Sequence, residues 1–179
     1  MWGVDHSFTL RHYVEAFSVE WVKERGILWT GTAWNSFNTT FAIALISSFP
    51  TAAIGILTAY LLTRHKFKGK NAFEFGTMLS FAIPGSVIGV SYVFAFNVPP
   101  LELTGTGIIL VIAFVFRNMP VGVRAGIASM NQLDPHLDEA SSTLNASSSQ
   151  TFRNVILPLL KPAITASLVF SFVRAMTAI

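Results

Sequence analysis

The sequence predicts an all-α, polytopic helical membrane protein with about four spanning helices, from its composition and the spacing of its charges. Of 179 residues, 52% are hydrophobic and 12% are charged, whereas roughly a quarter of residues in soluble domains are charged. No charge occurs in the 38 residues from Gly26 to Thr63 or in the 27 from Phe75 to Leu101. A helix of about 20 residues crosses the hydrocarbon. A soluble core of this size could bury one such helix but would leave the others without polar faces.

The four longest apolar segments are the expected spans. The first covers about 36–62, the second about 75–97, the third starts near Leu103, and the fourth follows Lys161 and runs to Ile179. The third must include Arg117, because the 14 residues before it would be only about 21 Å long at the helical rise. Residues 34–179 would form this transmembrane domain, after a lead-in of residues 1–33.

Lysine and arginine are unevenly distributed between the loops. The loops after the first and third spans are basic, whereas Val98–Glu102 between the second and third has no basic residue; the basic residues are Arg64, Lys66, Lys68, Lys70, Arg124 and Arg153. By the positive-inside rule the basic loops are cytoplasmic, so the N-terminus is on the outer, periplasmic side. A lysine cluster beside a span is explained by this topology, so we expect no nucleic-acid partner.

The lead-in has the pattern of an amphipathic helix lying on the outer membrane surface. Apolar residues recur at helical spacing among charged ones: Leu10, Tyr13, Val14, Phe17 and Trp21. Such a helix could provide a contact surface for a periplasmic partner, or simply pack on the lipid headgroups before the first span.

A polar segment at about 134–158, between the last two spans, has the signals of a helix-turn-helix. Asp134 can cap a helix that begins with Pro135, and Asn145 tolerates the left-handed conformation that ends one. Ser147 and Gln150 have the spacing of a capping box for a second helix, which Pro158 limits.

The spacing in this segment resembles the EAA loop of ABC importer permeases, Glu-Ala-Ala-x3-Gly-x9-Ile-x-Leu-Pro. The loop of this chain contains Asp138, Glu139, Ala140, Ser141, Asn145, Ala146, Val155, Leu157 and Pro158. Ser141 replaces Ala, Asn145 replaces Gly and Val155 replaces Ile. All three changes are mild; in particular, Asn tolerates the positive φ that Gly would adopt. The resemblance implies that these residues dock onto a separate ATP-hydrolysing subunit and couple it to transport.

Helix-breaking residues and charged residues within the spans indicate a candidate substrate path or gate. Gly85 and Gly89 follow Pro84 near the middle of the second span, which predicts either a bent, pore-lining helix or ordinary close helix packing. Gly122 and Gly126 repeat the spacing in the third span. An arginine well inside a span, such as Arg174, normally faces protein or water. Arg117 and Arg174 are therefore the remaining residues of the candidate path. The alternative is that the Arg174 side chain extends toward the membrane surface.

Sequence motifs for catalysis or for metal and nucleotide binding are absent. Gly69-Lys70-Asn71 lacks the upstream glycine and the hydroxyl of a P-loop, and the four histidines are far apart. We therefore expect a non-catalytic subunit that binds no metal or other cofactor of its own. ATP and Mg would be bound by the partner subunit.

Three further segments, at 97–107, 117–126 and 172–179, resemble the second half of the iron(III) permeases of bacterial ferric ABC importers. The resemblance implies a type I importer fold in the bacterial inner membrane, a periplasmic substrate-binding protein and two ATPase subunits. These permeases are double-length chains, so we expect this one to be truncated at its C-terminus. It would then need the remaining half of the permease or a second permease subunit. Permeases for phosphonate, polyamine, thiamine or sulfate share most of this architecture.

Two other classes would also fit a bundle of spanning helices. A secondary transporter would share the broken helix and the intramembrane arginine but would not need a capped cytoplasmic helix pair. A membrane-embedded assembly subunit would not depend on an ATPase.

Overall fold

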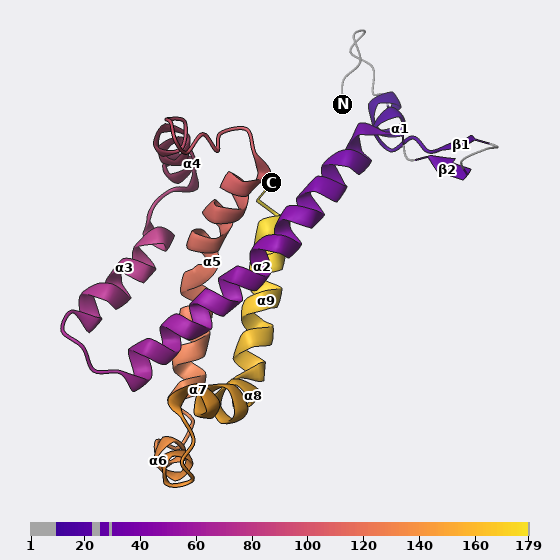
Figure 1. Ribbon diagram of the computed structural model, residues 1–179. Coiled ribbons are helices and arrows are strands. Elements are labelled where there is room, and N and C mark those ends of the chain that lie inside the picture. The colour runs from indigo at the N-terminus through magenta and orange to yellow at the C-terminus, as the bar shows by residue number, and fades with distance from the viewer. Residues whose placement is uncertain (1–9, 23–25, 29, 179) are drawn as a thin grey trace. The chain divides into compact units, whose positions relative to one another are not determined.

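The computed structural model describes residues 10–22, 26–28 and 30–178 of the chain (Figure 1). The described part is mostly helical, as predicted. It divides into two units, Met1–Ala42 and Ile43–Ile179, which we treat separately. Within the described residues, α2 (Thr32–Arg64) and α5 (Gly107–Met130) are each long and apolar enough to cross a membrane, and up to four spans result if each of two bent helix pairs counts as one.

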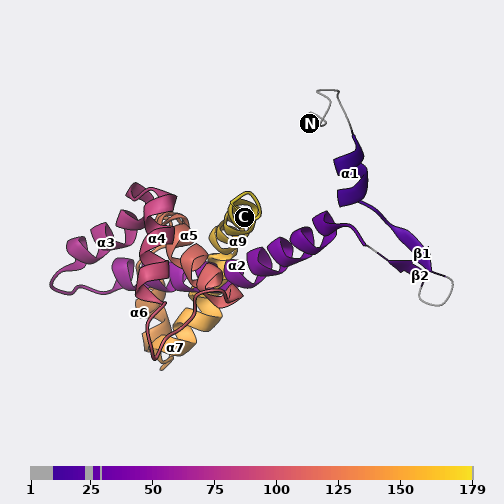
Figure 2. The ribbon, with the colours of Figure 1, turned by 90° about the horizontal axis from the view of Figure 1, so that it is seen from above.

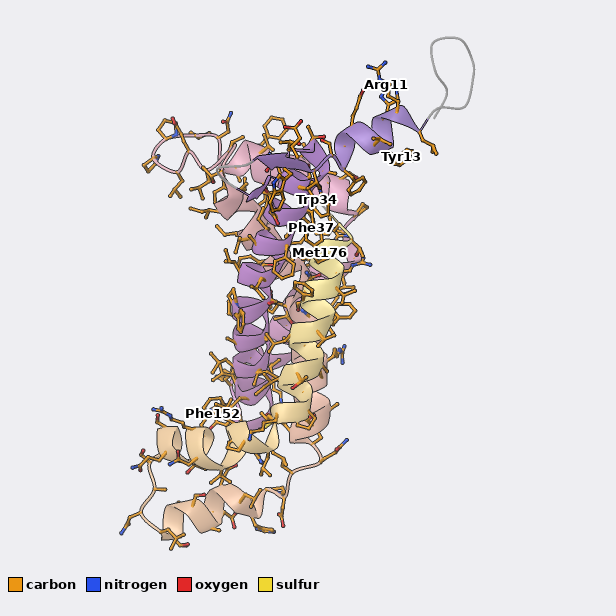
Figure 3. The ribbon with its side chains drawn as sticks, turned by 90° about the vertical axis from the view of Figure 1, so that its right-hand side faces the viewer. Arg11, Tyr13, Trp34, Phe37, Phe152 and Met176 are labelled. Carbon is orange, nitrogen blue, oxygen red and sulfur yellow. The ribbon has the colours of Figure 1, made fainter. Side chains whose placement is uncertain are left out.

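The first unit contains a shorter helix than the lead-in pattern predicted. α1 covers only Arg11–Ala16, and two strands, β1 (Glu20–Val22) and β2 (Gly26–Leu28), pair antiparallel with Trp21 opposite Ile27. The prediction of a helix reaching Trp21 is therefore wrong. The sequence Val-Glu-Trp-Val at 19–22 is rich in β-branched and aromatic residue types, which favour strands. Figure 3 labels Arg11 and Tyr13 on α1.

The second span is divided into two helices. α3 (Lys70–Ala82) and α4 (Gly85–Ala95) meet at 105°, a sharper break than the predicted bend, and the pair can still count as one broken span. Ile83 and Pro84 between them are extended, with ψ of 130° and 139°, because the residue before a proline avoids the helical region and proline cannot donate the helical hydrogen bond. Pro84 is therefore the breaker, as predicted.

The third and fourth spans form the centre of the second unit. α5 includes Arg117, as predicted, and lies between α3 and α9 (Lys161–Met176), which is apparent in Figures 1 and 2. Two clusters of buried apolar residues join α2 and α5 with the C-terminal helices, and a third joins α2 and α5 with Met78 of α3.

Small residues allow α2 and α5 to cross closely. A Cβ on Gly55 of α2 would be 3.0 Å from the Cα of Gly122, and a Cβ on Gly126 would be 2.5 Å from the Cβ of Ala59. Each helix thus presents two small residues four positions apart, the arrangement that lets helix backbones approach each other in membranes. Gly122 and Gly126 are packing residues of this crossing.

A polar helix pair follows α5. α6 (His136–Thr143) comes first, and α7 (Ser148–Thr151), the π-helical turn η1 (Phe152–Ile156) and α8 (Leu157–Leu159) then form one continuous rod. The rod meets α9 at 70°. Pro158 was expected to limit the rod, and it lies one residue before the last helical residue, Leu159. In Figure 3 Phe152 of this pair and Met176 of α9 lie at opposite ends of the bundle.

We predict that Gly126→Ala destabilises the protein. The added methyl would overlap Ala59, and overpacking costs about 1–3 kcal/mol, so the midpoint of thermal unfolding of the purified permease should fall. Gly76→Ala is the matched control, because a Cβ there meets nothing within 4 Å. Equal midpoints for the two variants would contradict the close crossing of α2 and α5.

Candidate functional site

The first helix of the polar pair is capped at both ends by its own sequence. The Asp134 carboxylate accepts a 2.9 Å hydrogen bond from the backbone N–H of His136, and Pro135 already has helical dihedrals. At the other end Asn145 has a φ of 57°. The N–H of Ala146 donates to the Ser141 carbonyl, which completes a Schellman turn together with the bond from Asn145 to Ser142. Asp134 and Asn145 thus act at the two ends as predicted, although α6 begins at His136 rather than at Pro135.

The second helix begins with the predicted capping box. The Ser147 N–H donates to Gln150 Oε1 over 2.8 Å, and the Gln150 N–H donates to Ser147 Oγ over 3.3 Å. These two hydrogen bonds satisfy backbone N–H groups that have no partner inside the helix. They fix where the second helix begins after the left-handed residue Asn145. The connection between the two helices is therefore short and rigid.

An ion pair joins the helix pair to the end of α2. Arg64 Nε lies 3.0 Å from Asp138 Oδ2, and the Arg64 side chain is 15% exposed. Reduced exposure to water strengthens such a pair relative to one on the surface. Asp138 thus contacts its own chain, and sequence reasoning missed this role because Arg64 was interpreted only as a topogenic charge.

Glu139, one residue further, faces outward. Its side chain is 77% exposed and lies 3.1 Å from His136 Nδ1. The hydrogen bond with Glu139, together with the negative charges of Asp134 and Glu139, raises the pKa of His136 above its ordinary value. The outer face of α6 therefore carries an acidic group and a histidine that is more readily protonated.

The remaining predicted loop residues divide between the outer surface and the interior. Ala140 and Pro158 are exposed, Ser141 is buried, and Ala146, Val155 and Leu157 are partly buried. The Ser141 hydroxyl donates to the Leu137 carbonyl over 2.8 Å inside α6. Only part of the motif is thus exposed on the surface, and the rest builds the loop.

The rod of the second helix is packed onto the bundle. The rings of Tyr60 on α2 and Phe152 on the rod are 4.6 Å apart. A buried cluster then joins α2, α5, the rod and α9: Ile56, Met130, Ile156, Leu160 and Ala163. A displacement of the rod would therefore be transmitted to three long helices.

Leu144 is an exposed apolar side chain at the turn between the two helices. It is 83% exposed, although the surrounding sequence is polar. It is the residue that follows the last turn of α6, five positions after Glu139. An isolated leucine in a polar loop was the available signal, and sequence reasoning did not use it.

The residues of the candidate path lie around one cleft beside the first half of α5. Gly85, Gly89, Arg117 and Arg174 line a cavity of about 390 Å³ between α4, α5 and the end of α9. Pro84 is the N-cap of α4 beside it. The Arg117 guanidinium lies so close to Gly85 that a Cβ there would be 2.5 Å from its nitrogen, whereas Gly89 has open space. Gly85 and Gly89 therefore do not form a helix-packing contact within the described chain.

A smaller cavity adjoins the two arginines. It is about 30 Å³ and is lined by Ser80, Phe81 and Asn118 as well as by Arg117 and Arg174. Asn118 is 1% exposed, and its amide nitrogen has no hydrogen-bond partner among the described residues. Within the described part of the chain, neither arginine is in an ion pair.

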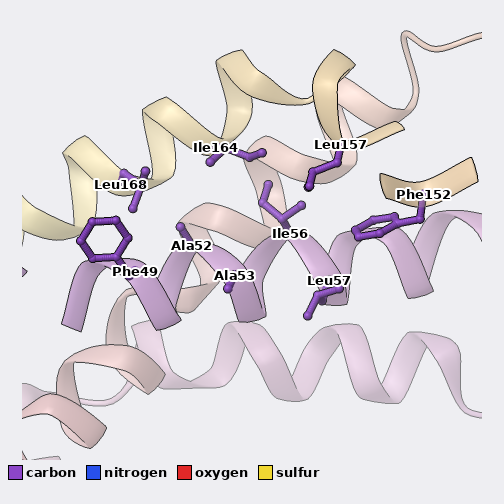
Figure 4. Close-up of a pocket in the computed structure, with 9 residues that line it drawn as sticks. All are labelled: Phe49, Ala52, Ala53, Ile56, Leu57, Phe152, Leu157, Ile164 and Leu168. Atoms are coloured by element: carbon purple, nitrogen blue, oxygen red, sulfur yellow. The ribbon is translucent and has the colours of Figure 1, made fainter. Parts of the chain in front are cut away.

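A separate, apolar groove lies where α2 faces the rod and α9 (Figure 4). It has a volume of about 390 Å³ and is lined by Phe49, Ala52, Ala53, Ile56, Leu57, Phe152, Leu157, Ile164 and Leu168. Its lining is aliphatic and aromatic, so it provides no group for binding a charged solute.

A family profile described as "Binding-protein-dependent transport system inner membrane component" matches residues 51–179. The chain belongs to this family. The match covers the helix pair, the cleft and most of the helices that hold them. Membership of this family favours a component of a binding-protein-dependent transport system over a secondary transporter.

Curated relatives include ferric and sulfate permeases. The chain is 48% identical over 99% of its length to a putative ferric transport system permease protein FbpB 1 of Haemophilus influenzae, of which it covers 27%. It is also 48% identical to the ferric transport system permease protein FbpB of Actinobacillus pleuropneumoniae, covering 25%. The sulfate transport system permease protein CysT of Salmonella typhimurium is 30% identical over 79% of the chain. The chain spans about a quarter of the length of the two ferric relatives.

We predict that Glu139→Gln lowers the pKa of His136 toward its ordinary value. Because the pKa of His136 is raised, its contact with Glu139 stabilises α6 fully below about pH 6.5, the ordinary pKa of histidine. This stabilisation is lost as the pH rises through the raised pKa of His136. NMR titration of isotope-labelled histidine in the purified permease would measure the change. Glu102→Gln, in another loop, should leave His136 unchanged; an unchanged His136 in Glu139→Gln would contradict the contact.

Proposed function

We propose that this chain is part of the transmembrane subunit of an ATP-driven ABC importer for ferric iron. The 48% identity to two ferric permeases over 99% of the chain supports the substrate. Sulfate is the second candidate, since a sulfate permease is 30% identical over a shorter stretch.

The observation that carries the proposal is the anchoring of the polar helix pair. Its first helix is paired with α2 through Arg64 and Asp138, and its second helix packs on α2, α5 and α9. A partner that pulls on Glu139 and Leu144 would move all three helices, because neither short helix can move independently of its anchor. This is the requirement for coupling ATP hydrolysis to a change in helix arrangement.

The proposal assigns the remaining parts of the transporter to other polypeptides or other segments. ATP and Mg are bound and used by a separate ATPase subunit, which receives Glu139, Ala140 and Leu144 in a surface groove. A periplasmic binding protein delivers the substrate to the opposite face. The remaining permease helices, from the same or a second polypeptide, enclose the path.

We predict that Glu139→Lys in the complete transporter reduces ATP-dependent uptake of ⁵⁵Fe. Reversing an exposed charge at a complementary interface should weaken ATPase association on the order of tenfold, equivalent to about 1.4 kcal/mol, while membrane insertion stays intact. Vesicle uptake and co-purification of the ATPase would measure both effects.

Glu102→Lys is the matched control for this experiment, since Glu102 is exposed in the loop before α5. Undiminished uptake and ATPase binding in Glu139→Lys would overturn the coupling assignment. Uptake of ³⁵S-sulfate in place of iron by the unmodified transporter would overturn the ferric assignment.

The distribution of basic residues predicts the orientation of the helix pair. The chain contains no cysteine, so Ser148→Cys and Thr104→Cys supply single labelling sites. A membrane-impermeant maleimide should label Ser148→Cys only from the cytoplasmic side and Thr104→Cys only from outside. The opposite pattern would overturn the proposal, because the helix pair would then face away from ATP.

A further inference from the structure

The cleft between α4, α5 and α9 has a strongly one-sided charge. Arg117 and Arg174 both line it, and no carboxylate is among the described residues that line the cleft or the small cavity beside it. A bare ferric ion carries three positive charges, so two guanidinium groups would repel it. The cleft is therefore unsuited to a free cation.

The N-terminus of α4 adds to the same field. α4 has 11 residues and begins at Gly85, and its N-cap, Pro84, provides no side-chain cap. The first amides of a helix carry partial positive charge and bind anions when nothing else accepts their hydrogen bonds. Gly85 is where the Arg117 guanidinium makes its close approach, so helix dipole and side chain act at the same point.

A buried donor points to a ligand independently of these charges. Asn118 is 1% exposed, its amide nitrogen has no partner among the described residues, and it lines the small cavity with both arginines. A buried amide without a partner costs free energy unless an acceptor is supplied. An oxygen of an anion held by the guanidinium groups would be such an acceptor.

We infer that this cleft binds an oxyanion, phosphate or carboxylate, that is coordinated to the ferric ion during transport, so that the species which crosses is an anionic complex. Arginine recognises both kinds of oxyanion through paired N–H donors. The inference rests on the proposed ferric function, because it names the chemical form in which the iron moves. It also assigns Arg117, Arg174 and Asn118 as ligand-binding residues.

The first test measures binding without transport. The complete transporter in nanodiscs is treated with phenylglyoxal, and mass spectrometry follows modification of Arg117 and Arg174 with phosphate, citrate, ferric citrate or chloride present. At about nine-tenths occupancy an anion should slow modification roughly tenfold by mass action. Arg124 is the control, since its side chain is 64% exposed and its modification should not respond to the anions.

Equal modification rates at Arg117 and Arg174 in chloride and in oxyanion would overturn the inference. So would complete resistance of both arginines in every buffer, because that would mean the cleft is closed to solutes. Neither outcome depends on iron uptake, so the proposed function would stand.

The second test follows the oxyanion through the membrane. Vesicles take up ⁵⁵Fe delivered with ³²P-phosphate or ¹⁴C-citrate, and one of the two labels should enter with the iron. Arg117→Gln and Arg174→Gln should lower both signals in parallel, with partial rescue by Arg117→Lys. Lys68→Gln removes one charge from an exposed loop residue and should change neither signal.

Iron that enters without either oxyanion label, or that is unaffected by both glutamine variants, would overturn the inference while supporting the ferric function. A transporter that takes up no iron would overturn the ferric function instead, and the protection experiment would still determine whether the cleft binds an oxyanion.

Discussion

The close crossing of α2 and α5 is the constraint on which the rest of the second unit depends. Gly55 meets Gly122, and Ala59 meets Gly126, so the two backbones approach without intervening side chains. Between helices in lipid there is little hydrophobic driving force, and packing of this kind provides much of the attraction. The crossing brings the end of α2 beside the end of α5, where the polar helix pair begins. There Arg64, the last residue of α2, lies 3.0 Å from Asp138 of α6.

The two anchors of the helix pair differ in kind, and the difference has a mechanical consequence. The ion pair of Arg64 with Asp138 is a polar contact at one point. The cluster that includes Ile156 and Leu160 is apolar and fully buried, and close-packed interiors resist gradual deformation. The second helix is therefore expected to move together with α9, and the first is held to α2 through the contact of Arg64 with Asp138.

The local structure of the loop could be predicted from the sequence because its determinants are local. Asn145, Ser147 and Gln150 each act within about one helical turn, and the structure has all three in the predicted roles. The break at Pro84 was anticipated but its 105° angle was not, because the angle depends on how α3 and α4 pack on α5. Likewise nothing local indicated that Asp138 would be used internally. In the first unit, helical periodicity suggested one long helix where strand propensity prevailed at Trp21.

The break at Pro84 links helix geometry to the chemistry of the cleft. A continuous second span would satisfy its amides internally and present only side chains to Arg117. The break instead creates a new helix N-terminus at Gly85, where the absence of a side chain leaves room for the guanidinium. A proline that stops a helix and a glycine that admits an arginine thus concentrate positive charge where α4, α5 and α9 meet. Among the described residues that line this cleft no acidic group offsets that charge, so its electrostatic field favours an anionic form of whatever solute enters it.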